Sequence, residues 1–462
     1  MRVLLLGTGS ADGWPNPWCR CASCTWAREH GEVRTSTAAL VDGRLLLDCG
    51  PEAPRQADRA GVSLAEVRTV LLTHAHHDHL DPAALLSRSW ARRDDELVVA
   101  GPPSAIDACR HWIAPHDPVR LVPLAPGDVL DHDGYVVRAL AAAHDTGVDP
   151  LTSDALLYDV TAPDGARLLY ATDTGPLSDE TVAAVAGAAF DVVLVEETFG
   201  STFDHGTGHL DLATLPRELV RLSDAGATTD VTDVVVVHMS HHNPRGDELE
   251  RILAAWRVRL VPDLTEIDTA ASGPRRAERT PRRRLVLGGA RSGKSHEAER
   301  SLLATSSVVY VATGGDREGD LEWAQRVRTH RERRPARWTT VETLDVASVV
   351  AKAEPHEALL VDCLALWLVG RLDATDVWAS VAGTSGHDHA LDAVERDVTE
   401  LVAAVRECRA QLVLVSNEVG SGVVPEHASG RLYRDLLGTL NARIAAECDD
   451  VDLVVAGRVV HL

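Results

Sequence analysis

The sequence predicts two α/β domains joined by a polar connector. Its 462 residues are too many for one ordinary core, and apolar runs of strand length alternate with helical patterns in both halves. Residues 268–283 show no apolar periodicity and are rich in arginine and proline. We therefore predict a first domain over residues 1–267, a solvated connector over 268–283 rather than a nucleic-acid or membrane tether, and a second domain over 284–462.

Composition narrows the classes of partner. The formal net charge of −23 disfavours a broad nucleic-acid surface, because phosphate backbones are bound by basic side chains. No run of about 18 apolar residues occurs, so we expect a cytoplasmic protein without membrane contact. Of the eight cysteines, Cys19, Cys21 and Cys24 cluster at ligand spacing, which is not the pattern of a disulfide framework.

The first domain opens with strand-like runs at 3–6, 38–41, 45–48 and 69–73, followed by a helical pattern over 82–93. Directly after the fourth run come four potential metal ligands within six residues: His74, His76, Asp78 and His79. They cannot all face one ion from a regular strand or helix. The spacing therefore predicts a loop that divides its ligands between two neighbouring metals.

Three further potential ligands follow strand-like runs, namely His144, Asp173 and His238. Each one alone would more often cap a strand end. Together with the four-ligand loop they predict a dinuclear metal site.

With these motifs, residues 1 to about 265 resemble the metallo-β-lactamase superfamily. The resemblance implies an αβ/βα sandwich and seven ligands for two zinc or manganese ions. These ligands are His74, His76 and His144 on one metal, Asp78, His79 and His238 on the other, and Asp173 between them. Such a pair of metals supports hydrolysis without a protein nucleophile but does not identify the substrate. We expect a phosphodiester or cyclic phosphate.

The cysteine cluster supplies three of the four ligands that a closed tetrahedral zinc requires, with His241 or His242 as the fourth. This arrangement resembles the phosphoribosyl cyclic phosphate phosphodiesterase branch, which implies a structural zinc held by Cys19, Cys21, Cys24 and His241. The same resemblance implies that His209 assists catalysis by protonating the leaving oxygen. The alternatives are three reduced cysteines in a loop and a surface histidine at 209.

The second domain opens on an apolar strand that runs into a glycine-rich loop and a helix. The loop has the spacing of a phosphate-binding loop, in which backbone N–H groups surround a phosphate, Lys294 neutralises it and Ser295 holds magnesium. Its residues are Gly288, Gly289, Ala290, Arg291, Ser292, Gly293, Lys294 and Ser295.

Strands and helices then alternate, which predicts a three-layer α/β domain with a mainly parallel sheet. Asp362 ends one apolar run, where a carboxylate near the nucleotide's magnesium is expected, although it could simply cap a helix. The polar stretch between Gly370 and Ala390 predicts a variable loop, and a helix should follow over 390–409.

A helix with a basic face is predicted around His330. Its arginines are surface residues by default. Beside a phosphate-binding loop, however, they could bind a triphosphate and leave His330 in position to act on it.

These blocks, with those at 361–364 and 416–426, resemble the bifunctional adenosylcobinamide kinase and adenosylcobinamide-phosphate guanylyltransferase family over 284–462. The resemblance implies that, with Mg²⁺ and GTP or ATP, the domain phosphorylates adenosylcobinamide and that His330 and Lys294 take part in passing GMP from GTP to the product. The resemblance also implies a homotrimer. Glu418 is a weaker candidate for a residue of the site. Further implied nucleotide contacts are Thr313, Gly314, Gly315, Arg331, Glu332, Arg333, Arg334, Glu342 and Asp362.

We therefore expect a cobalamin-biosynthesis enzyme of small-molecule substrates fused to a metal-dependent hydrolase. One alternative is a metallohydrolase that carries a regulatory GTP-binding module, which needs no histidine able to be guanylylated. For the first domain, a ribonuclease would need a basic surface, and an inert scaffold would lack the ligands.

Overall fold

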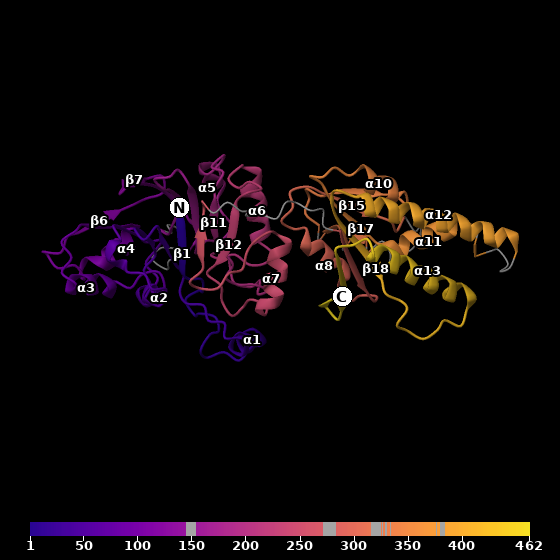
Figure 1. Ribbon diagram of the computed structural model, residues 1–462, viewed down its shortest axis with the longest axis horizontal. Coiled ribbons are helices and arrows are strands. Elements are labelled where there is room, and N and C mark those ends of the chain that lie inside the picture. The colour runs from indigo at the N-terminus through magenta and orange to yellow at the C-terminus, as the bar shows by residue number, and fades with distance from the viewer. Residues whose placement is uncertain are drawn as a thin grey trace. The chain divides into compact units, whose positions relative to one another are not determined.

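The computed structural model describes residues 1–144, 154–270, 283–315, 325, 327–328, 330–332, 334–375, 377–378 and 384–462. The chain divides into two compact units, Met1–Arg276 and Ala277–Leu462 (Figure 1). Most of the predicted connector, at 271–282, and the predicted nucleotide contact Arg333 lie outside the described residues.

The first unit contains a seven-stranded and a six-stranded sheet, in the orders β13-β1-β2-β3-β4-β5-β6 and β12-β11-β10-β9-β8-β7. The first sheet consists of β1 (Arg2–Gly7), β2 (Ala38–Val41), β3 (Leu45–Leu47), β4 (Thr69–Leu71), β5 (Leu97–Gly101), β6 (Val119–Pro123) and β13 (Glu266–Asp268). The second consists of β7 (Val129–His132), β8 (Tyr135–Ala141), β9 (Leu156–Thr161), β10 (Arg167–Ala171), β11 (Val192–Glu196) and β12 (Asp233–Val237).

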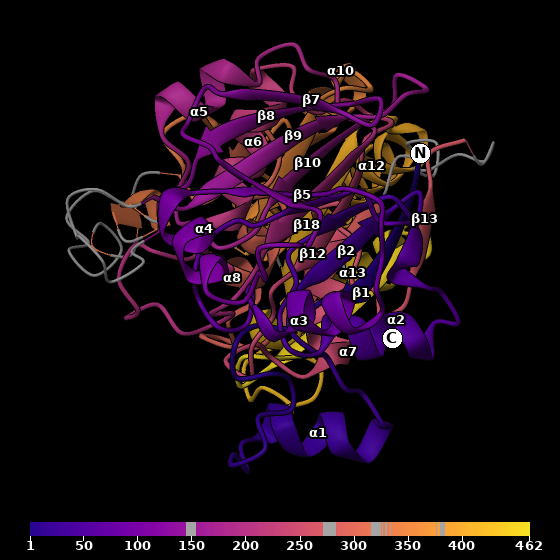
Figure 2. The same cartoon turned by 90° about the vertical axis from the view of Figure 1, so that its left-hand side faces the viewer.

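Side-chain alternation explains how these sheets form layers. Leu45 and Leu47 join a core shared with strands of the second sheet, whereas Leu46 joins an outer core with α2 (Ala53–Arg59) and α4 (Pro103–Arg110), because successive strand residues face opposite sides. The predicted αβ/βα sandwich is thereby confirmed. The remaining helices are α1 (Ala22–His30), α3 (Ala83–Trp90), α5 (Asp179–Ala184), α6 (Leu215–Asp224) and α7 (Gly246–Ala255). Figure 2 shows α1 standing off from the sheets.

The second unit is built on one sheet of order β16-β15-β17-β18-β14-β19-β20, in which only the β19–β20 pair is antiparallel among the described strands. The predicted mainly parallel sheet is confirmed. Its strands are β14 (Arg283–Gly288), β15 (Val308–Ala312), β16 (Thr339–Glu342), β17 (Ala358–Asp362), β18 (Gln411–Asn417), β19 (Asp450–Val455) and β20 (Arg458–His461). Its helices are α8 (Lys294–Ser301), α10 (Val346–Lys352), α11 (Leu364–Ala374), α12 (Ser385–Glu407) and α13 (Ala428–Ala445).

The predicted loop between Gly370 and Ala390 is partly helical. α11 continues to Ala374, and α12 begins at Ser385, where the Thr384 side chain accepts a hydrogen bond from the N–H of His387. This N-cap starts the helix within a polar stretch, because a cap satisfies backbone donors without any apolar pattern. None of the described helices is long and apolar enough to cross a membrane.

One buried acid distinguishes the first unit. Glu197 follows β11, and its Oε1 accepts a hydrogen bond from Gly200 N at 3.0 Å. Among the described residues, Oε2 of Glu197 and Oδ1 of Asn243 have no hydrogen-bond partner, while Asn243 Nδ2 donates to the Glu197 carbonyl at 3.1 Å. Burial raises the pKa of Glu197 to about 8, so the side chain is protonated at neutral pH.

This proton predicts a pH dependence of stability. The folded protein holds it more tightly than the unfolded chain, whose glutamate titrates near 4.5, so the free energy of unfolding should fall as pH rises from about 4.5 to 8. Glu197→Gln should remove this slope and be the more stable protein at pH 8.5, by on the order of 5 kcal/mol. Urea unfolding at pH 6 and 8.5 measures the effect. The exposed Glu180→Gln is the control, and equal slopes in the wild type and Glu197→Gln would contradict the expectation.

Candidate active sites

The seven predicted metal ligands of the first unit lie together. His74, His76, His144 and Asp173 form one group, and Asp78, His79, Asp173 and His238 form another, with the ligand atoms of each group within 4.8 Å of one another. Asp173 belongs to both groups. Its Oδ2 lies 3.3 Å from His74 Nε2, and its Oδ1 lies 3.2 Å from His79 Nε2 and 2.8 Å from His238 Nε2.

These ligands come from loops at the ends of strands in both sheets. The loop 74–79 follows β4, whereas His144, Asp173 and His238 come after β8, β10 and β12. Asp173 and His238 have positive φ values of 54° and 58°, a conformation that costs a non-glycine residue energy and that surrounding structure must maintain. A Cβ at Gly50, which follows β3, would lie 1.9 Å from the Asp78 carbonyl oxygen, so only glycine fits at this position beside the loop 74–79.

The outward nitrogens of the ligand histidines are held by neighbours. Asp48 Oδ2 lies 2.7 Å from His79 Nδ1 and also accepts from the Tyr170 hydroxyl at 3.1 Å. His144 Nδ1 lies 3.0 Å from the Gly208 carbonyl oxygen, and His238 Nδ1 lies 2.9 Å from Thr198 Oγ1. In each of these three histidines Nε2 is directed towards the cluster. A partner on the outer nitrogen orients metal-binding histidines in this way.

The donor set fits two transition-metal ions. It consists of imidazole and carboxylate groups that are almost all buried, and His79 Nε2 has no hydrogen-bond partner among the described residues despite lying against two carboxylates. Burial lowers the pKa of His74, His76 and His144 and favours the neutral imidazole, which is the form that binds metal.

His209 lies at the edge of this cluster with a carboxylate that the sequence did not single out. Its ring centroid is 4.7 Å from that of His144, and its Nδ1 lies 3.2 Å from Oε2 of the fully buried Glu196. Glu196 also accepts from the backbone N–H groups of Thr174 and Leu210. Burial opposes protonation, but Glu196 raises the pKa of His209 above its ordinary value. The sequence feature that could have identified Glu196 is the acidic pair Glu196-Glu197 at the end of an apolar strand.

The cysteine cluster gathers around His241. Cys19, Cys21, Cys24 and His241 form one group of potential ligands, with His241 Nδ1 3.9 Å from Cys21 Sγ. His241 Nε2 lies 3.3 Å from Asp12 Oδ2. His242 is directed elsewhere, with its Nδ1 3.3 Å from Thr202 Oγ1. Three thiols and one imidazole within reach of one point suit tetrahedral zinc.

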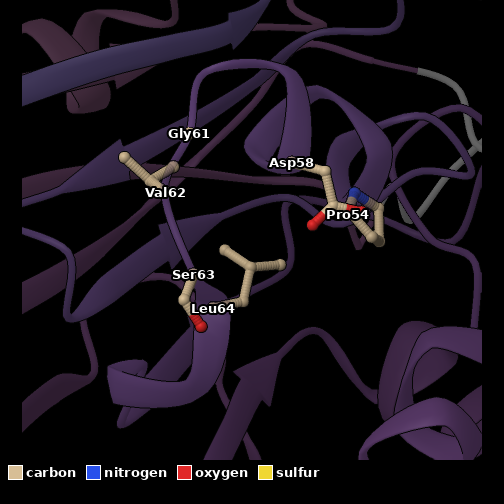
Figure 3. A pocket seen from close by; sticks show the side chains of 6 residues that line it. All are labelled: Pro54, Asp58, Gly61, Val62, Ser63 and Leu64. Carbon is tan, nitrogen blue, oxygen red and sulfur yellow. The ribbon is translucent and has the colours of Figure 1, made fainter.

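A separate hollow of about 430 Å³ lies beside α2 (Figure 3). Its lining contains no histidine or cysteine, and its acidic residue Asp58 pairs with Arg55 at 3.0 Å. It therefore lacks the groups that metal-dependent hydrolysis requires. The lining residues are Pro54, Asp58, Gly61, Val62, Ser63 and Leu64.

In the second unit the glycine-rich loop connects β14 to α8. Lys294 begins α8 and is buried, and its Nζ donates to the Gly289 carbonyl oxygen at 3.2 Å. Arg291 and Gly293 have positive φ values of 56° and 100°. A Cβ at Gly288 would lie 2.7 Å from the Val454 carbonyl oxygen, so the loop is compact at its start. Positive φ values within such a loop give the conformation from which backbone anion sites are built.

His330 and Asp362 lie close together in this unit. His330 Nδ1 is 3.8 Å from Asp362 Oδ2 and 3.8 Å from Oε1 of Glu299, a residue that the sequence did not single out. Arg334 lies over the Tyr310 ring, 3.8 Å from its centroid, and its Nε donates to the His330 carbonyl oxygen at 2.9 Å. Two carboxylates suit a hard cation such as magnesium bound with a nucleotide.

The remaining predicted nucleotide contacts are spread around β15 and β16. Thr313 Oγ1 donates to the Cys363 carbonyl oxygen at 2.7 Å, and Gly314 and Gly315 follow it. Arg331 and Glu342 pair with each other, while Glu332 is exposed. Glu418 accepts from the N–H of Gly420 at 2.7 Å, which is a structural role within its own loop.

Comparison with known proteins assigns each unit to a family. Residues 284–462 match the family described as cobinamide kinase / cobinamide phosphate guanyltransferase, and residues 43–258 match the β-lactamase superfamily domain. The bifunctional adenosylcobalamin biosynthesis protein CobU of Salmonella typhimurium is 38% identical over an alignment of 182 residues that covers 37% of this chain and 95% of that protein. CobP of Pseudomonas aeruginosa is 43% identical over 179 residues, covering 38% of this chain and 94% of CobP.

A third relative matches the first unit. Ribonuclease Z of Mycobacterium avium is 28% identical over an alignment of 310 residues that covers 59% of this chain and 99% of that protein. The CobU match exceeds 30% identity and spans nearly the whole of that relative. Through its second unit, the chain therefore belongs to the cobinamide kinase / cobinamide phosphate guanyltransferase family, and a β-lactamase superfamily domain precedes that unit.

Proposed function

We propose that the second unit phosphorylates adenosylcobinamide and then transfers GMP from GTP to adenosylcobinamide phosphate through His330. The observation that carries this proposal is the position of His330 against Asp362 and Glu299, the latter on the helix that Lys294 begins. A nucleophilic histidine next to a phosphate-binding loop is expected of a nucleotidyltransferase and is not needed by a regulatory GTP-binding module.

Different residues of this unit would bind the phosphates, the magnesium ion and the rest of the nucleotide. The backbone N–H groups of 288–295 and the Lys294 ammonium would bind the phosphates, and Ser295 and Asp362 would hold magnesium. Magnesium, when bound, reduces the negative charge on the phosphate oxygens. Arg331, now paired with Glu342, and Arg334, now over the Tyr310 ring, would leave these partners to contact the nucleotide. The other proposed nucleotide contacts are Thr313, Gly314, Gly315, Glu332, Arg333 and Glu342.

Labelling with GTP tests this assignment. Wild-type protein incubated with magnesium and GTP labelled at the α-phosphate should acquire acid-labile, base-stable label, whereas His330→Ala should acquire none while still binding GTP. Lys294→Ala should reduce labelling by at least about 100-fold, because a phosphate contact that forms in the transition state is lost. Absence of label on wild-type protein that binds GTP would overturn the proposal in favour of a regulatory module.

We propose that the first unit is a dinuclear metal-dependent hydrolase of a phosphodiester or cyclic phosphate. His74, His76, His144, Asp78, His79, His238 and the shared Asp173 would hold two zinc or manganese ions. Bound metals of this kind activate water and neutralise charge on the phosphate. Glu196 lies against Nδ1 of His209 and raises the pKa of this histidine, which favours the protonated ring whose Nε2–H can give a proton to the departing oxygen.

Hydrolysis of bis(p-nitrophenyl) phosphate by the zinc- or manganese-loaded protein tests this role. Asp173→Ala should abolish turnover, because both metal sites lose a ligand. His209→Ala should lower kcat by about 100-fold for alkyl esters and much less for nitrophenyl esters, whose leaving oxygen needs no proton. His116→Ala, at a histidine whose side chain is 82% exposed, is the control. An equal loss for both kinds of ester would contradict the acid role.

Similarity to ribonuclease Z favours an RNA phosphodiester as the second candidate substrate. The net charge of −23 favours the small molecule. Comparing turnover of phosphoribosyl cyclic phosphate with cleavage of precursor RNA under the same conditions separates the two. We further propose that the protein acts in the cytoplasm and assembles as a homotrimer through its second unit.

We also propose that Cys19, Cys21, Cys24 and His241 hold a structural zinc and that Asp12 orients His241. Asp12 is itself held by Ser10 Oγ at 2.7 Å and Asn16 Nδ2 at 3.0 Å, so its carboxylate is fixed where it faces His241 Nε2. A carboxylate on the outer nitrogen of a metal-binding histidine fixes the tautomer and increases the basicity of the ligand nitrogen.

Cobalt substitution tests this arrangement, because only the thiolate site gives intense sulfur-to-cobalt absorption. His241→Ala should lose this absorption, and His242→Ala should retain it. Asp12→Ala should weaken metal binding about 10-fold to 100-fold in chelator competition. The exposed Asp94→Ala is the control for loss of a surface carboxylate. Loss of absorption in His242→Ala but not in His241→Ala would reverse the assignment.

A further inference from the structure

Two buried carboxylates flank one nitrogen of His330. Glu299 Oε1 and Asp362 Oδ2 each lie 3.8 Å from His330 Nδ1. The side chains of Glu299 and Asp362 are only 7% and 9% exposed, compared with 22% for His330. Negative charge is therefore concentrated on the Nδ1 side of the ring, where little water is available to screen it.

Both carboxylates are fixed by regular structure. Asp362 ends β17, and its Oδ2 accepts from the Tyr310 hydroxyl of the neighbouring β15 at 2.9 Å. Glu299 lies on α8, which packs on β14, β17 and β18. Arg334 links the histidine segment to the same strand through the Tyr310 ring and the His330 carbonyl oxygen. Nδ1 of His330 thus faces two carboxylates whose positions are fixed by α8 and β17.

We propose that Glu299, with Oδ2 of Asp362 beside it, is a positioning residue that keeps a proton on Nδ1 of His330 and makes Nε2 the nitrogen that accepts the guanylyl group. The inference rests on the proposed guanylyltransferase function. A carboxylate stabilises the tautomer whose N–H faces it, which leaves the lone pair on the opposite ring nitrogen. The α-phosphate of GTP is itself anionic, so the Glu299 carboxylate, which is not a proposed magnesium ligand, opposes its approach to Nδ1.

Neither guanylylation of His330 nor transfer of the guanylyl group requires an external base. The Nε2 lone pair forms a bond to the α-phosphorus of GTP, the bond from that phosphorus to the bridging oxygen of the β-phosphate breaks, and pyrophosphate leaves with the electron pair. The Nδ1 proton stays, so the substituted ring is cationic and faces Glu299 and Asp362. When a phosphate oxygen of the acceptor attacks the same phosphorus, the electron pair returns to Nε2 and neutral His330 is restored.

The attachment site can be measured directly. Full-length protein containing ¹⁵N-labelled histidine is incubated with magnesium and GTP, and the nitrogen bonded to phosphorus is identified from its one-bond ¹⁵N–³¹P coupling in NMR spectra. Phosphorus on Nε2 is expected. Phosphorus on Nδ1 would overturn this inference and leave the proposed function intact, whereas no guanylylated His330 would overturn both.

The role of Glu299 is tested with a matched pair of variants on α8. Glu299→Gln should slow guanylylation about 10-fold or more, mainly through kcat, with little change in the KM for GTP, because it alters the histidine and not the phosphate contacts. Glu297→Gln removes another buried carboxylate of α8, which pairs with Arg284 and Arg300, and should change the rate less than about 3-fold. Equal effects of the two variants would overturn the positioning role. If Glu299→Gln fails to fold, the attachment site in wild-type protein still decides the inference.

Discussion

In both units, a carboxylate at the carboxyl end of a buried strand lies against histidine, and the rest of each site is arranged around that contact. Asp173 after β10 faces His74, His79 and His238, and Asp362 at the end of β17 faces His330. A buried carboxylate without a counter-charge is costly. Each carboxylate therefore requires imidazole, metal or a hydrogen-bond donor nearby, and the neighbouring loops supply these groups.

This requirement extends to a second layer of side chains that control which histidine nitrogen is available. Asp48 and Thr198 lie against Nδ1 of His79 and His238, and Glu196 lies against Nδ1 of His209. The arrangement at His241 is reversed, since Nδ1 lies beside the cysteines and Asp12 lies beside Nε2. Imidazole has one donor and one acceptor when neutral, so fixing one nitrogen determines the chemistry of the other.

The first unit also maintains costly backbone conformations at its site. Asp173 and His238 have positive φ, and Gly50 and Gly175 pack closely against backbone oxygens. A Cβ at Gly50 would lie 1.9 Å from the Asp78 carbonyl oxygen, and one at Gly175 would lie 1.7 Å from that of Thr207. The core can hold the loops of Asp173 and His238 because the strands that precede them, β10 and β12, are buried on both faces along most or all of their length. Rigid strands thus position loops that would not adopt these conformations alone.

The sequence by itself determined the fold class of each unit and most of the potential metal ligands that the structure brings together. Motifs such as 74–79 and 288–295 are local, so their spacing alone predicts what they bind. It did not identify Asp12, Asp48, Glu196 or Glu299, and it named His241 as the fourth ligand of the cysteine cluster with His242 as an open alternative. Asp48 and His79 are 31 residues apart, and Asp12 and His241 belong to distant parts of the chain. Only the tertiary structure decided these partners, because contact between distant segments depends on how strands pair and helices pack, and a single carboxylate carries no periodic signal in sequence.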